Sequence, residues 1–551
     1  MTFLFHDDPR FIAGLRRHGL LRDYGYRIHN TGLDRRPFGE RWIDSPLLAE
    51  ARRSGRPFYI DRIAGGMPFQ SLKGIEQVAA GVKDDSRFLG FQLHEWGNSP
   101  IHDYQRVGEL LLKKGLPFSR EHFAEYEGRT ESPFFGGGDF DIYETVYRPL
   151  HTQKDAEEYH AAYFRRMSEL TAGHLMAVNG YFQLYHTALK LGARNVMAEI
   201  GNQVPLTALQ IACVRGAARQ HGKEFGVYYE PWGGAPFGCP CAVGWSPWFP
   251  GGGNPDNKVM GYKIRPELGS SRSLQRRLLY YAWLSGARWC AEEWGVENYF
   301  SNWDDYPLTE YGRVVQEFIE LTSKFGPAVP IVPAAIVLPR NTPMIDLRYV
   351  GGYSDQLYEM FPADEFHVRM RHFALRVLGA RPHRNGFDDF NLTPSPWIGS
   401  FDVLSADAPA DLLRRYDLLV YFSKGRPAPP ARPEQRILTY TGTDDDARTC
   451  VEALRQPAGD VEGEVGCARA HIAGRGIMIG LFNNLGVSKR DGKETTDPEA
   501  TRTATVRGLP PNVDLPLGEQ FATRRDRDSI EIAIPAGEIV LLLIPGDQQM
   551  R

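Results

Sequence analysis

A long alternation of short β-rich segments with amphipathic helical segments, from residue 56 to residue 326, most constrains the fold of this chain. Parallel strands joined by crossover helices produce this pattern. The segment 206–221 shows the helical part of it, because its apolar residues recur with the helical period and form one face that a sheet can cover. Strands are expected at these positions: 58–63, 88–94, 174–178, 195–199, 225–230 and 288–292.

This alternation has about the length of one (β/α)8 barrel, the TIM barrel fold, which we predict over residues 1–328. The clear strands are fewer than the eight that close such a barrel. We therefore expect one or two further strands in the irregular segments or within the first 50 residues.

The chain changes character after three closely spaced prolines, Pro327, Pro330 and Pro333. Strands and helices then alternate on a smaller scale, which predicts a doubly wound, flavodoxin-like α/β domain over residues 329–458. Beyond it, β-rich segments are separated by Gly, Pro and Asp turns. We predict a C-terminal β-sandwich over residues 459–551.

Composition and charge argue against several classes of protein. The formal net charge is -4 over 551 residues, without a long Lys/Arg stripe, so nucleic acid is not expected as a partner. No segment approaches the roughly 18 consecutive apolar residues of a membrane span. Residues 1–10 carry acids and a proline where an export signal needs basic residues and an apolar core, so we expect a cytoplasmic protein. The cysteines are mostly far apart, as is usual for reduced thiols.

Four of the expected strands run into a glutamate. The segments are FQLHEWG at 91–97, VMAEIG at 196–201, VYYEPWG at 227–233 and WCAEEWG at 289–295. Removing a carboxylate from water is costly unless it is paired or hydrogen-bonded, so a buried strand has no structural reason to end in one. In a (β/α)8 barrel, however, the C-terminal ends of the strands form the active site. Several acids that converge there indicate hydrolysis of a sugar linkage.

A barrel with glutamates at its strand ends, followed by an α/β domain and an all-β domain, resembles the family 42 β-galactosidases and other three-domain glycoside hydrolases of clan A. In that clan the acid/base glutamate follows barrel strand four and the nucleophile follows strand seven. The segments that match by order contain Glu199 and the pair Glu292 and Glu293. Ala198 stands where the clan usually has an asparagine before its glutamate. The resemblance also implies a homo-oligomer, a dimer or trimer, formed through the α/β domain.

The resemblance implies a retaining exo-glycoside hydrolase that releases a terminal sugar by double displacement. Glu199 would protonate the glycosidic oxygen and then activate water, and Glu293 or Glu292 would form the glycosyl-enzyme. Neighbouring side chains on a strand point to opposite faces, so only one of these two can enter the barrel mouth. Glu95 and Glu293 both precede Trp-Gly, and this similarity favours Glu293.

Further polar and aromatic residues near the expected strand ends are candidates for binding the sugar. Indole faces suit the apolar C–H faces of pyranose rings, although tryptophan is equally used to fill cores. An Asp61–Arg62 ion pair with a purely structural role, and a Glu230 that orients a catalytic group, are alternatives for these acids. The candidates are Asp61, Arg62, His94, Glu95, Glu230, Trp232 and Trp294.

No metal or cofactor is expected. Cys239 and Cys241 have one residue between them, whereas paired cysteines at a zinc site usually have two to four. Two other functions stay open: a non-catalytic carbohydrate-binding protein on a barrel scaffold, and a metal-dependent hydrolase that uses His94, Glu95 and Cys241.

Overall fold

The structure is a computed structural model. It describes residues 1–28, 37–64, 72–94, 96, 115, 152–179, 184–201, 206–230, 256–257, 262–263, 270–293, 299–339, 365–381, 391–422, 432–490 and 493–546.

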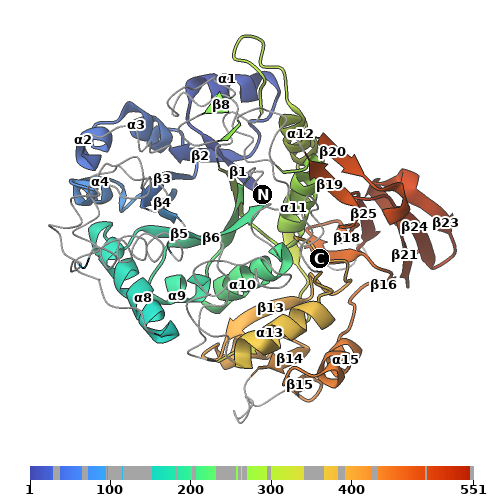
Figure 1. The fold of residues 1–551 in the computed structure, drawn as a ribbon. Helices are drawn as coiled ribbons and strands as arrows, with labels where there is room; N and C mark the ends of the chain where they lie inside the picture. Colours follow the sequence, from blue (N-terminus) through green and yellow to red (C-terminus); the bar gives the residue numbers. More distant parts are fainter. Residues whose placement is uncertain are drawn as a thin grey trace.

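Eight parallel strands close into a barrel, in which each strand pairs with the next and β10 pairs with β1 (Figure 1). The predicted (β/α)8 barrel is therefore confirmed. The strands that were missing from the sequence count are β1 and β2, which lie within the first 28 residues. The barrel strands are β1 (Thr2–His6), β2 (Tyr24–Ile28), β3 (Phe58–Ala64), β4 (Phe88–His94), β5 (Leu175–Asn179), β6 (Asn195–Gly201), β7 (Phe225–Glu230) and β10 (Trp289–Glu292).

Helices follow the strands and surround the barrel (Figure 1). Several begin at a residue whose side chain accepts a backbone N–H of the first turn, as Thr152 does for α8 and Ser271 for α11. Among the described helices, none combines the length and the apolar character that a membrane span requires. The described helices of the barrel region are α1 (Pro9–Arg17), α2 (Phe38–Trp42), α3 (Pro46–Arg53), α4 (Ile75–Val82), α8 (Gln153–Leu170), α9 (Leu184–Lys190), α10 (Thr207–Gln220), α11 (Arg272–Leu284) and α12 (Glu310–Thr322), with the short strands β8 (Asp256–Asn257) and β9 (Tyr262–Lys263).

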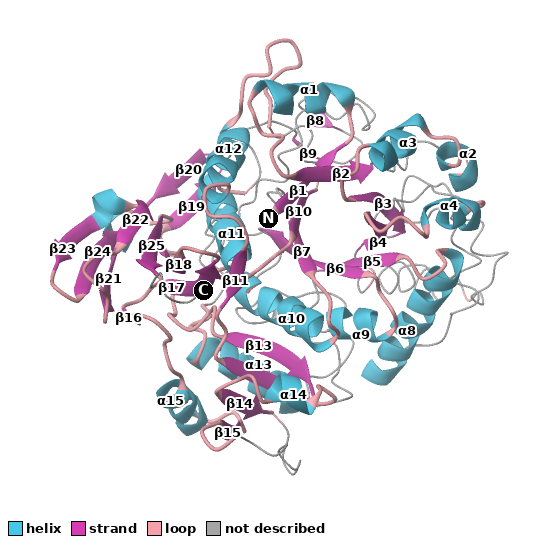
Figure 2. Cartoon of the chain, turned by 180° about the vertical axis from the view of Figure 1, so that it is seen from behind, coloured by secondary structure: helices cyan, strands magenta, loops and turns pink. Residues whose placement is uncertain are grey.

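A parallel four-stranded sheet packs against the outer side of α10 (Figures 1 and 2). Its strand order is β13-β12-β14-β15, as expected for a doubly wound α/β layer. Gly216 of α10 is required at this contact, because a Cβ there would lie 2.1 Å from the carbonyl oxygen of Val403. The elements are β12 (Ala334–Leu338), α13 (Glu365–Arg376), β13 (Phe401–Ser405), α14 (Ala410–Leu413), β14 (Leu418–Tyr421), β15 (Arg436–Thr439) and α15 (Asp444–Ala453).

The C-terminal part forms two antiparallel sheets with a shared apolar core, which includes Val461, Ile479, Val506 and Leu542. This is the sandwich arrangement that the sequence predicted. Figure 2 shows these sheets beside α11 and α12. One sheet has the order β11-β17-β18-β25-β22 and the other β16-β21-β24-β23, while β19 pairs with β20. The strands are β11 (Ala328–Pro330), β16 (Asp460–Glu462), β17 (Gly466–Ile472), β18 (Gly476–Phe482), β19 (Val487–Arg490), β20 (Lys493–Thr496), β21 (Arg502–Arg507), β22 (Asp514–Leu517), β23 (Ala522–Arg525), β24 (Ser529–Ile534) and β25 (Ile539–Pro545).

Candidate active site

The inside of the barrel is apolar in its middle layers and ionisable at the C-terminal ends of the strands. Because side chains alternate along a strand, a residue two positions after an inward-facing one also faces inward. Tyr59, Met197, Tyr228 and Ala291 belong to one buried apolar cluster with residues of other barrel strands. Two positions after them stand, in the same order, Asp61, Glu199, Glu230 and Glu293, all at most 6% exposed.

His94 reaches the same site because β4 carries one extra residue. The pairing of β3 with β4 shifts by one between Phe58↔Phe88 and Tyr59↔Gly90, so β4 contains a bulge at this point. Gly90 has a φ of +139°, and a Cβ there would meet the carbonyl oxygen of His174 at 2.9 Å. After the bulge, Gln92 and His94 face into the barrel. Without the bulge, the alternation of side chains would have turned the residues next to them inward instead.

Glu199, Glu293 and His94 meet at this end of the barrel. His94 Nε2 lies 3.9 Å from Glu199 Oε1 and 3.8 Å from Glu293 Oε1. One oxygen of each carboxylate and a ring nitrogen of His94 all lie within 4.8 Å of one another. Arg62 forms a buried ion pair with Glu293. The two acids that the sequence proposed as a catalytic pair therefore share one buried site.

A second buried pair lies beside them. Arg27 of β2 approaches Asp61, with Nε 3.9 Å from Oδ2. Arg27 was not singled out from the sequence, because it lies on β2, a strand that was not located there. Among the described residues, Arg62 thus pairs with Glu293 and Asp61 with Arg27.

Burial determines the charge of the histidine at the site. It lowers the pKa of His94 well below its usual 6.5, and the nearby Arg62 guanidinium lowers it further, while Asp61 opposes the shift. The imidazole is therefore neutral at physiological pH. The site thus combines ionisable carboxyl groups with a neutral histidine and two arginines.

Glu292 faces away from this cluster. Gln275 Nε2 of α11 donates to Glu292 Oε1 at 3.1 Å, and Arg27 donates to the backbone carbonyl of Glu292. Burial raises the pKa of Glu292 to about 7, against the hydrogen bonds from Gln275 and Tyr299. Of the two adjacent glutamates, the structure brings Glu293 and not Glu292 to Glu199.

The sequence matching by strand order was wrong. Because β1 and β2 both precede residue 29, Glu199 belongs to the sixth strand and Glu292 ends the eighth. The seventh strand ends at Glu230. The fourth ends at His94, and Glu95 follows it in the sequence.

Both aromatic candidates lie outside the part of the chain that the structure describes. Glu95, Trp232 and Trp294 lie outside the described residues, as do Cys239 and Cys241. Trp96 is buried and packs against His160 and Phe164 of α8, with ring centroids 5.7 and 5.2 Å apart. That tryptophan is a core residue.

Among the described residues, His94, Glu199 and Glu293 form a group whose atoms are close enough to share a metal ion. Arg62, however, already places a positive charge on Glu293. A guanidinium in that position already supplies positive charge beside the carboxylate, as a bound cation would.

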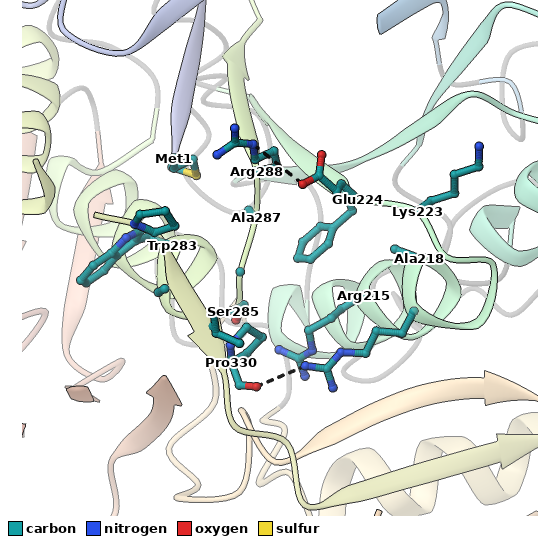
Figure 3. Close-up of a pocket in the computed structure, with 16 residues that line it drawn as sticks. Met1, Arg215, Ala218, Lys223, Glu224, Trp283, Ser285, Ala287, Arg288 and Pro330 are labelled. Atoms are coloured by element: carbon teal, nitrogen blue, oxygen red, sulfur yellow. Dashed lines mark hydrogen bonds and ion pairs between the residues drawn. The ribbon is translucent and has the colours of Figure 1, made fainter. Parts of the chain in front are cut away.

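A separate cavity of about 320 Å³ lies at the opposite end of the barrel (Figure 3). It is lined by residues that precede strands, such as Arg288 before β10 and Glu224 before β7. Arg288 Nε lies 3.9 Å from Glu224 Oε1, and Arg219 donates to the carbonyl of Pro330 at 3.2 Å. Its arginines are thus occupied by partners of the chain, and it shares no residue with the carboxylate cluster.

Comparison with family models and with curated proteins finds no match. Among the solved structures that are similar, one is described as a polyextremophilic β-galactosidase from the Antarctic haloarchaeon Halorubrum lacusprofundi; it is 12% identical, has a TM-score of 0.45, and the alignment covers 99% of each chain. Another is described as GH5_18 from Streptomyces cattleya in complex with GlcNAc; it is 13% identical, has a TM-score of 0.38, and the alignment covers 81% of this chain and 98% of that one. At this level of similarity the two structures give no evidence about activity, which has to be inferred from the site itself.

Proposed function

We propose that this protein is a retaining glycoside hydrolase that releases a terminal sugar from an oligosaccharide or glycoside. The observation that carries the proposal is the approach of Glu199 to Glu293, with oxygens within 4.8 Å, at the C-terminal end of a closed barrel. Carboxyl groups of retaining enzymes stand about 5 to 5.5 Å apart, whereas those of inverting enzymes leave about 6.5 to 9.5 Å for a water molecule. The spacing favours the retaining reaction.

In the proposed reaction, Glu199 donates a proton to the glycosidic oxygen while Glu293 attacks the anomeric carbon. The C–O bond to the leaving group breaks as the bond to the carboxylate forms. Glu199, now ionised, takes a proton from water, which attacks the anomeric carbon and releases Glu293. Arg62 stabilises the ionised form of Glu293 before the attack and again after its release. The chemistry requires no metal or cofactor.

The corrected strand count offers a second assignment of the same two roles. The glycoside hydrolases that the chain resembles have their acid/base glutamate after strand four and their nucleophile after strand seven. In this chain those places belong to Glu95 and Glu230. Glu199 and Glu293 would then bind sugar hydroxyls or orient the catalytic groups.

We further propose that the remaining polar residues of the site bind the sugar, with Asp61 and His94 as hydroxyl contacts and Trp232 and Trp294 as stacking surfaces. A cytoplasmic location and a dimer or trimer formed through the α/β layer complete the proposal. Neither affects the site chemistry.

A panel of nitrophenyl glycosides tests the function, with the anomeric product followed by NMR. We expect turnover of one sugar class, with the configuration of the product retained. Glu199→Gln should abolish hydrolysis of an alkyl glycoside but partly spare an aryl glycoside, because a good leaving group needs less protonation. Equal losses on both substrates would remove Glu199 as the acid. Sugar binding without any turnover would overturn the proposal as a whole.

A further inference from the structure

Gln92 connects Arg62 to His94 at the base of the carboxylate cluster. Its side chain is fully buried at an inward position of β4. Its Oε1 accepts the backbone N–H of Arg62 at 2.9 Å, and its Nε2 lies 3.4 Å from His94 Nδ1. The two ends of one amide therefore face two groups of the proposed active site.

The chemistry of these groups determines where the histidine proton lies. A backbone N–H can only donate, so the amide atom facing Arg62 is the oxygen, and the amide NH2 faces His94. Because the NH2 also only donates, Nδ1 must present its lone pair. A neutral imidazole carries one ring proton, which is then on Nε2, the atom 3.9 Å from Glu199 and 3.8 Å from Glu293.

We propose that Gln92 is a positioning residue that fixes His94 as the Nε2–H tautomer, so that His94 donates hydrogen toward the Glu199–Glu293 pair. Its expected effect on catalysis rests on the proposed function, whereas the tautomer itself does not. Burial and Arg62, which lower the pKa of His94, agree with this arrangement because they keep the ring neutral.

The position of this proton distinguishes two possible arrangements of His94, Glu199 and Glu293: a histidine that donates toward two carboxylates, or a metal centre. A metal bound at His94 Nε2 would need the lone pair on that atom, and the proton would move to Nδ1, where it would face the NH2 of Gln92. Two donors would then oppose each other in a buried site. Gln92 therefore favours a histidine that directs its N–H toward the carboxylate pair over a metal centre.

NMR of protein labelled with 15N-histidine tests the tautomer directly. The chain has 15 histidines, and the signal that disappears in His94→Asn is assigned to His94. We expect a neutral ring with its proton on Nε2. A proton on Nδ1, or a charged ring at pH 7, would overturn the proposal without any variant of Gln92.

Gln92→Glu tests the cause. One oxygen of the new side chain can still accept from Arg62, but the other then faces Nδ1 and requires a proton there, so His94 should change to Nδ1–H. Gln92→Met, which removes the donor, should give a mixture of tautomers. Gln275→Met is the matched control, because Gln275 is a buried glutamine that contacts Glu292. An unchanged His94 signal in both Gln92 variants would contradict the proposed role.

Kinetics separate this inference from the proposed function. If the protein hydrolyses glycosides, Gln92→Glu should lower kcat by about 10- to 100-fold with a smaller change in KM, as for other residues that orient a functional histidine. An Nε2 proton on His94 in a protein that turns over no glycoside would leave the tautomer inference intact and remove the function. A proton on Nδ1 in an active glycosidase would overturn the tautomer inference and leave the function intact.

Discussion

Arg62 forms a buried ion pair with Glu293 while its own backbone is left-handed, with a φ of +47°. Such a conformation costs a non-glycine residue on the order of 1 to 3 kcal/mol, and it persists only where the surroundings impose it. Gln92 contributes to this by accepting the backbone N–H of Arg62. The position of this guanidinium is therefore set by the barrel and not by the preference of Arg62 itself.

Removing this guanidinium should destabilise the protein. Arg62→Met leaves the buried Glu293 carboxylate without its cation, and we expect a loss of about 3 to 5 kcal/mol in the free energy of unfolding. The double variant Arg62→Met/Glu293→Met should recover much of it, because no uncompensated charge stays behind. Urea unfolding at pH 7 measures both. Arg166→Met, at an exposed ion pair with Glu169, should cost less than about 1 kcal/mol and serves as the control.

The two adjacent glutamates should differ in their effect on catalysis. Glu293→Gln removes a carboxylate from the cluster with Glu199, and we expect kcat to fall by several orders of magnitude on the best nitrophenyl glycoside. Glu292→Gln changes a group that faces Gln275 of α11, so kcat should stay within about threefold of wild type. A reversed order of the two losses would remove Glu293 from the catalytic pair.

Much of this arrangement could be predicted from the sequence where local patterns decide it. β4 and β7 have the predicted bounds, because each is an uninterrupted β-rich run that ends at a polar group. β1 and β2 are five residues each and were not located, so Glu199 lies on the sixth strand instead of the fourth and Glu292 on the eighth instead of the seventh. That single error assigned Glu199 and Glu292 to the wrong strands.

Contacts across the barrel could not be predicted in the same way. The alternation rule correctly required Glu292 and Glu293 to face opposite sides, but it could not say which one faces inward. The inward direction of His94 depends on a bulge at Gly90, which adds one residue without any break in the apolar pattern. The Arg62–Glu293 pair joins the third strand to the end of the eighth, and it is visible only once the barrel closes.

Glu292 should make stability depend on pH in the neutral range. Burial raises its pKa from 4.5 to about 7, so between these values the folded protein holds a proton that the unfolded chain has released. Stability contributed by this group therefore falls as pH rises from 4.5 to 7 and is constant above, by about 3 kcal/mol in total. Glu292→Gln should lack this slope and be more stable than wild type at pH 8. Urea unfolding at pH 5 and pH 8 measures this. If the free energy of unfolding changed by the same amount between the two pH values in wild type and in Glu292→Gln, the assignment would be contradicted.

Asp402 should give the opposite dependence at acid pH. Burial alone would raise its pKa, but Arg219, Arg215 and the hydroxyl of Tyr416 outweigh it and hold the pKa below 3.8. Its stabilising effect is thus present above pH 3.8 and is lost as pH falls through the folded pKa. Asp402→Asn leaves two arginines of α10 without their carboxylate, and we expect a loss of about 3 to 5 kcal/mol at pH 7. The gap between the variant and wild type should narrow as acid is added, and a constant gap down to pH 2 would contradict the assignment.

The covalent intermediate should identify the nucleophile by mass. A 2-fluoro analogue of the preferred sugar with a good leaving group forms the glycosyl-enzyme but hydrolyses slowly, because the fluorine destabilises the oxocarbenium-like transition state of the second step. Tryptic cleavage places Glu292 and Glu293 in the peptide 289–313 and Glu230 in the peptide 224–258. We expect the label in 289–313, with fragmentation assigning it to Glu293. A label on Glu230 would establish the assignment by strand count and make Glu95 the acid, whereas a label on Glu292 would contradict the outward orientation of that side chain.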